Sequence, residues 1–161
     1  GLAKEAEVTS GAFYGYFPSK EAAFKEAVTV GIDDLRSGVE RLQAEHGAGW
    51  LEVFIDFYLG HRRTCELGET CALQSLTPEV VRADVQIKTA FEGHLRAAVE
   101  AVAAGLGHLS GAQRLDRAWS LLALLSGAVT MARAVGDEAT SREIASAAKQ
   151  AALTLCGRTT G

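Results

Sequence analysis

Hydrophobic residues recur at three- and four-residue spacing along most of the chain, which predicts amphipathic helices. The longest pattern runs from Lys20 to about His46, and Ser19 before it is a favourable N-cap. Gly47-Ala48-Gly49 breaks this pattern, and a second helix is expected from Trp50 to about Thr64. The stretch 66–69 is expected to be a loop.

Four further helices are expected in the second half of the chain. A short one spans about 71–82 and is disturbed at Thr77-Pro78, and another runs from Asp84 to about Leu106. Ser110 with Gln113, and Thr140 with Glu143, have the spacing of capping boxes. The helices that begin at these two boxes are expected to end at about Val135 and Leu155. No segment has the pattern of a strand, so the predicted fold class is all-α.

Composition limits the class of protein. A length of 161 residues suits one domain, or one core with a small appendage, and 48% hydrophobic with 22% charged residues excludes a disordered chain. The net charge of −4 gives no electrostatic argument for nucleic acid. Three cysteines cannot all pair within one chain, and no signal peptide is visible, so we expect reduced thiols and a cytoplasmic location. The longest uncharged apolar stretch, 118–132, is too short to span a membrane.

Residues 2–21 carry the most specific pattern in the sequence. A short helix, a tight turn, a second short helix and a capped third helix together predict helix-turn-helix geometry. Thr9 would cap the second helix, Gly11 and Ala12 are small enough for close approach to a groove, and Lys20 suits a backbone phosphate. The expected DNA contacts are Thr9, Ser10, Gly11, Ala12, Tyr14, Tyr16 and Lys20.

This segment resembles the DNA-binding signature of the tetracycline-repressor (TetR/AcrR) family. The positions that match the signature are Ala3, Ala6, Val8, Gly11, Tyr14, Tyr16, Phe17, Ser19, Lys20 and Glu21; Glu7, Phe13 and Ala23 depart from it. The resemblance implies a partial DNA-binding unit with its connecting helix at residues 1–46, since the family's first helix would precede Gly1. It also implies a ligand-binding and dimerisation domain at residues 47–161.

The resemblance further implies a homodimer formed by the last two long helices, about 113–135 and 140–155. The first of these is apolar almost all round, and the second carries a stripe of small residues that allows close helix approach. A core within the single chain is the alternative for either face. The expected interface residues are Leu122, Leu125, Val129, Ala145, Ala148 and Ala152.

Aromatic and histidine residues of the middle helices are candidates for a ligand pocket, although an ordinary core is the alternative for each. The expected pocket residues are Phe54, Phe57, Tyr58, His61, Phe91, His94 and Trp119. Cys71 precedes a helix, which makes it a candidate thiol sensor or, alternatively, a small buried hydrophobe. His61, Cys65 and Cys71 do not have the spacing of a common metal site, and we expect no metal or cofactor.

The sequence therefore predicts a transcriptional regulator, most simply a repressor, that binds a palindromic DNA operator as a homodimer and responds to a small molecule. The alternative is a helical small-molecule-binding module without DNA binding. An all-α enzyme has no supporting residues, because no catalytic constellation is present in the sequence.

Overall fold

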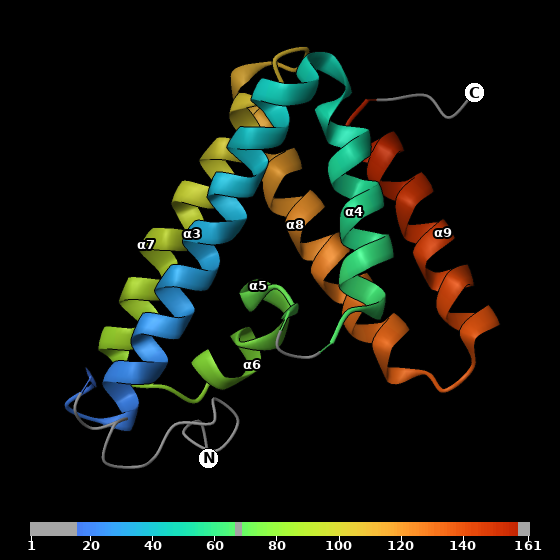
Figure 1. The fold of residues 1–161 in the computed structure, drawn as a ribbon. Coiled ribbons are helices and arrows are strands. Elements are labelled where there is room, and N and C mark those ends of the chain that lie inside the picture. The colour runs from blue at the N-terminus through green and yellow to red at the C-terminus, as the bar shows by residue number, and fades with distance from the viewer. Residues whose placement is uncertain (1–15, 67–68, 158–161) are drawn as a thin grey trace.

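The computed structural model describes residues 16–66 and 69–157, and this part of the chain is helical without a strand. The long helices are α3 (Lys20–His46), α4 (Trp50–Thr64), α7 (Val85–Ala104), α8 (Gly111–Ala134) and α9 (Glu138–Leu155) (Figure 1). Three short elements, η1 (Gly47–Gly49), α5 (Ala72–Ser75) and α6 (Thr77–Val80), connect them. The predicted all-α fold class is confirmed.

Capping side chains fix where the helices begin. The Ser19 hydroxyl accepts a hydrogen bond from the Ala22 N–H at 3.1 Å, and the Asp84 carboxylate accepts one from the Ile87 N–H at 2.9 Å. Ser110 and Gln113 form the predicted capping box of α8. These contacts explain why the predicted starts of α3, α7 and α8 agree with the structure to within one residue.

The start of α9 differs from the prediction. The helix begins at Glu138, and its N-cap is Asp137, whose carboxylate accepts hydrogen bonds from the Thr140 N–H at 2.9 Å and the Thr140 hydroxyl at 2.7 Å. These bonds, chiefly that from the Thr140 hydroxyl, lower the pKa of Asp137. The predicted capping box at Thr140 is therefore wrong, because an ionised carboxylate three residues earlier is available as the cap.

The helices form two groups that meet at one end of the molecule. α3 runs along α7, whereas α4, α8 and α9 pack together, and α5 and α6 lie between the groups (Figure 1). At the shared end the Trp50 indole N–H donates to the Gly105 carbonyl at 2.9 Å, and the Gln43 amide donates to the Ala101 carbonyl at 2.8 Å. These bonds tie α3, α4 and α7 together where the two groups diverge.

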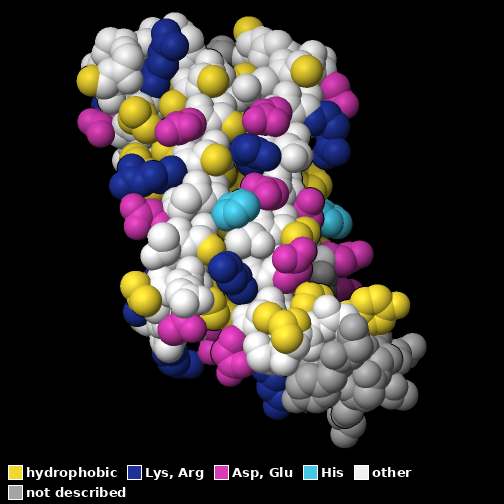
Figure 2. Space-filling view, turned by 90° about the vertical axis from the view of Figure 1, so that its left-hand side faces the viewer, with side chains coloured by type: hydrophobic (Ala, Val, Ile, Leu, Met, Phe, Trp, Pro, Cys, Tyr) yellow, Lys and Arg dark blue, Asp and Glu magenta, His cyan; other side chains and the backbone are white. Residues whose placement is uncertain are grey.

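The surface carries both signs of charge. Over the face of α3 and α7 turned to the viewer in Figure 2, acidic and basic side chains are interspersed with hydrophobic ones. Among the described residues, no helix has both the length and the apolar character needed to cross a membrane.

Close packing of α3 on α5 depends on Gly31. A Cβ atom at this position would overlap the Cβ of Ala72, whereas a Cβ at Gly38, two turns along the same helix, would meet no atom within 4 Å. We expect Gly31→Ala to lower the free energy of unfolding by about 1–3 kcal/mol, because the two helices must move apart. Gly38→Ala should be neutral, or stabilising by up to about 1 kcal/mol, through helix propensity. Urea denaturation of both variants checks the pair, and equal effects would contradict this packing.

The thiol of Cys156 should make the free energy of unfolding depend on pH in the alkaline range. Cys156 is fully buried, and burial raises the pKa of its thiol from 9.0 to about 11. Because the folded chain holds this proton more tightly than the unfolded chain, the stabilisation is complete below pH 9 and is lost as the pH rises through 11. We expect the free energy of unfolding to fall over this range and to fall less steeply in Cys156→Ala. Identical pH profiles in urea denaturation would contradict the assignment.

Candidate functional site

The predicted DNA-contact residues lie at the start of the chain, and most precede the described part. Thr9, Ser10, Gly11, Ala12 and Tyr14 are outside the described residues. Tyr16 is 83% exposed, and Lys20 is exposed at the first position of α3. The described end of this segment therefore presents an aromatic hydroxyl and a cation beside the N-terminus of a helix, a combination suited to phosphate contacts.

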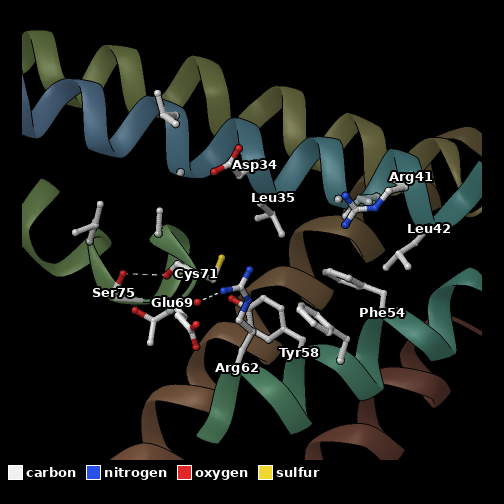
Figure 3. A pocket seen from close by; sticks show the side chains of 18 of the residues that line it. Asp34, Leu35, Arg41, Leu42, Phe54, Tyr58, Arg62, Glu69, Cys71 and Ser75 are labelled. Atoms are coloured by element: carbon white, nitrogen blue, oxygen red, sulfur yellow. Dashed lines mark hydrogen bonds between the residues drawn. The ribbon is translucent and has the colours of Figure 1, made fainter. Parts of the chain in front are cut away.

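A cavity of about 630 Å³ lies between α3, α4 and α5 (Figure 3). Its walls are mostly apolar and include Leu35, Val39 and Leu42 of α3 together with Phe54 and Phe57 of α4. A volume of this size is typical of small-molecule sites. The cavity is therefore the candidate ligand site of the chain.

Polar groups gather on the α4 side of the cavity. Tyr58 is 1% exposed, and among the described residues its hydroxyl has no nitrogen or oxygen hydrogen-bond partner; the Cys71 thiol, a weak hydrogen-bonding group, is its neighbour. Burial raises the pKa of Tyr58 well above its usual value of 10; the neighbouring Cys71 thiol adds to this rise, and the Arg62 guanidinium opposes it. Tyr58 is thus a neutral hydrogen-bond donor at physiological pH. Figure 3 shows its ring between the Arg62 and Phe54 side chains, with the Cys71 sulfur nearby.

Arg62 is held in place from two sides. Its Nη1 donates to the Glu69 carbonyl, and its guanidinium lies 5.3 Å from the centroid of the Phe57 ring. Arg133 of α8 donates to the Arg62 carbonyl at 3.1 Å and to the Cys65 carbonyl at 2.9 Å, so the end of α4 is fixed as well. These contacts position the guanidinium beside Tyr58.

Three of the predicted pocket residues, Phe54, Phe57 and Tyr58, line this cavity, and four do not. His61 is exposed and stacks on Phe57, with ring centroids 5.1 Å apart. His94 Nδ1 lies 2.8 Å from Asp33 Oδ1, beside a separate hollow between α3 and α7. Phe91 packs against the core, and Trp119 lies on α8, 36% exposed. His61, Phe91, His94 and Trp119 therefore do not line the same cavity as Tyr58.

Several cavity residues were missed by sequence reasoning. Asp34, Arg41, Arg62 and Glu69 all line the cavity, but each is polar and lies on a helix or loop whose pattern predicts solvent exposure. One signal was present in the sequence. Gly31 and Gly38 share a helical stripe with Asp34 and Arg41, which gives α3 a face of small and polar residues next to its buried side.

Cys71 and Cys65 have different surroundings. Cys71 is buried, lines the cavity and is the N-cap of α5. Cys65 is half-buried, and its Sγ lies within 4.8 Å of ligand atoms of His61 and Glu69. This trio replaces the set of His61, Cys65 and Cys71 considered from the sequence. His61 and Glu69 are exposed, and exposed groups of these types commonly lie together without an ion.

The residues expected at a dimer interface are covered by their own chain. Leu122, Leu125, Val129, Ala148 and Ala152 are buried in the core, and Ala145 is half-buried against it. They pack α8 against its neighbours within one molecule, which is the alternative that the sequence left open. The exposed side of α8 instead carries Leu115, Trp119 and Met131, and these three are among the exposed large hydrophobic residues of the described chain.

The comparison with known proteins bears on the N-terminal segment. The family model described as "Bacterial regulatory proteins, tetR family" matches residues 1–27, which include the segment predicted to form a helix-turn-helix and the first two turns of α3. A protein with this N-terminal segment and an all-α body is a DNA-binding transcriptional regulator. Residues 1–27 are therefore similar to the N-terminal segment of the tetR family of bacterial regulatory proteins. No curated protein matches the sequence.

Proposed function

We propose that the protein is a ligand-responsive repressor that binds a palindromic operator as a homodimer. In this proposal, residues 1–46 hold the DNA-binding unit with its connecting helix, and residues 47–161 form the regulatory domain. The effector occupies the cavity between α3, α4 and α5. The protein acts in the cytoplasm, where operator and effector are both accessible.

One observation carries the ligand response: a single helix links the DNA-binding segment to the cavity. α3 begins at Lys20, directly after the helix-turn-helix motif, and its residues from Ala27 to Leu42 line the cavity. Suppose that the protein has two conformations that differ in the position of α3. A compound that binds one conformation more tightly than the other increases the population of that conformation. The motif would move with the helix, so effector binding and DNA binding would be coupled.

The exposed face of α8 supports the homodimer. From Ala118 to Ala132 the helix has no charged residue, although Trp119, Ala123 and Met131 are exposed there. A face of four turns without a charged residue is uncommon on a helix that remains in water. A second copy related by two-fold symmetry would cover both faces at once.

Selection of DNA from a random-sequence pool tests the proposed function. We expect the intact protein to enrich an inverted repeat whose half-site centres lie about 10 base pairs, or about 34 Å, apart, because two symmetry-related helices would enter successive major grooves. Enrichment of a single asymmetric half-site would contradict the dimer. Recovery of unenriched sequence would contradict specific DNA binding altogether.

A further inference from the structure

The cavity contains an unsatisfied donor at its buried side. The Tyr58 hydroxyl is covered by the chain and has no nitrogen or oxygen partner among the described residues, only the weakly hydrogen-bonding Cys71 thiol beside it, and Tyr58 lines the cavity. A buried polar group left unpaired is costly, and native structures retain few of them. A ligand atom that accepts a hydrogen bond would satisfy this hydroxyl. The buried side of the cavity is therefore built for an acceptor.

A cation lies beside this donor. Figure 3 shows the Arg62 guanidinium beside the Tyr58 ring, and within the described chain Arg62 has no carboxylate at ion-pair distance. Its backbone bond to Glu69 and its contact with Phe57 use only part of the five donors that a guanidinium offers. The remaining donors match a carboxylate, which can accept two parallel hydrogen bonds.

The remaining walls of the cavity favour a ligand whose main part is apolar. Leu35, Val39 and Leu42 form one wall, and the Phe54 ring faces them from α4 (Figure 3). Burial of rings or methylene groups against these side chains would supply most of the affinity. Asp34 and Glu69 also line the cavity, but both are exposed, so water screens their repulsion of an anion.

We propose that the effector site binds an apolar monocarboxylic acid, whose carboxylate accepts hydrogen bonds from the Tyr58 hydroxyl and the Arg62 guanidinium while its ring or chain lies against Leu35 and Phe54. This inference rests on the proposed function only in identifying the cavity as the effector site. At the Tyr58 side of the cavity, one cation and one neutral donor match a single negative charge. An amine would instead be held by Asp34 and Glu69 at the exposed side, so it is the competing ligand.

Three compounds with one ring system separate these alternatives: 2-naphthoate, 2-naphthamide and 2-naphthylmethylamine. Isothermal titration calorimetry at pH 7.5 compares an anion, a neutral amide and a cation of nearly equal apolar area. We expect 2-naphthoate to bind at least about tenfold more tightly than the amide, since a desolvated charge pair is worth more than a neutral hydrogen bond. Tighter binding of the amide or the amine, or no binding of any of the three at millimolar concentration, would overturn the proposal.

Two variants assign the contacts. Arg62→Gln should weaken 2-naphthoate at least about tenfold and the amide less than about twofold, because only the anion needs the guanidinium. Tyr58→Phe should weaken both compounds by about three- to tenfold, since either can accept its hydrogen bond. Arg41→Gln is the matched control, as Arg41 is an exposed cavity arginine on α3. A loss of naphthoate binding in Arg41→Gln but not in Arg62→Gln would overturn the assignment.

The DNA measurement separates failure of this inference from failure of the proposed function. The affinity for the selected inverted repeat is measured with and without saturating 2-naphthoate. If the acid binds as expected but the DNA affinity is unchanged, the proposed ligand class is supported and the proposed coupling of ligand binding to DNA binding is contradicted. If none of the three compounds binds while the inverted repeat is still bound specifically, the proposed ligand class is contradicted and the DNA-binding function is supported.

Discussion

Leu125→Asp should abolish cooperative folding. Leu125 is fully buried between α8 and its neighbours, in contact with a core that also contains Leu121 and Val129. A carboxylate at this position would have neither water nor a cation to stabilise it, and the lost packing adds to the cost. We expect a destabilisation of more than about 4 kcal/mol, a large share of the stability of a domain of this size. Circular dichroism and thermal melting measure the loss.

Trp119→Asp, on the opposite face of the same helix, is the matched control. Trp119 is partly exposed, so the aspartate can reach water, and we expect the helical content to be retained. Since Trp119 lies on the uncharged face proposed for the dimer, its replacement should instead change the mass measured by light scattering from twice 17.0 kDa to 17.0 kDa. A dimer that persists in Trp119→Asp would contradict an interface on this face. A folded Leu125→Asp would contradict the description of the core.

Replacement of Tyr14 and Lys20 by alanine should abolish or sharply weaken DNA binding without changing the mass of the proposed dimer. Tyr14 lies in the motif matched by the family model, and Lys20 is the exposed first residue of α3. We expect the double variant to bind the selected inverted repeat at least about 100-fold more weakly, or about 2.7 kcal/mol, when a base-proximal contact and a phosphate contact are both removed. Fluorescence anisotropy with labelled duplex measures this change.

Lys20→Ala alone gives a more specific result. Loss of one phosphate contact should weaken binding to all sequences alike and reduce the slope of log affinity against log salt by about 0.9. Lys25→Ala is the control, because Lys25 is an exposed lysine one to two turns further along α3 and is not among the predicted contacts. An equal change of this slope in both variants would show that it depends on the total positive charge of the protein and not on a phosphate contact of Lys20.

The fold was largely predictable because its helix ends depend on local signals. Ser19, Asp84 and Ser110 each cap a helix with a hydrogen bond that spans three residues, so the sequence alone identifies them. The start of α9 was missed because Asp137 and Thr140 are both good caps, and only the structure shows that the carboxylate accepts from Thr140. Local sequence patterns therefore predict that a helix is present, but they do not show which of two nearby capping residues begins it.

The candidate site was less predictable because it depends on tertiary packing. Phe54, Phe57 and Tyr58 lie within five residues on α4; they were expected at a pocket because they are aromatic, and they line this cavity. Arg62 and Glu69 come together only through the loop after α4, and His94 lies away from this cavity because it pairs with Asp33 where α7 contacts α3. No periodicity indicates which side of α3 faces α7 and which side faces the cavity.

The affinity of the intact protein for the selected inverted repeat, compared with a duplex of the same composition and scrambled order, tests the central claim most directly. The measurement is made at one salt concentration near 150 mM, since non-specific binding depends steeply on salt. A sequence-specific regulator should bind the inverted repeat at least about 1,000-fold more tightly than the scrambled duplex. Equal affinity for the two duplexes would contradict the account.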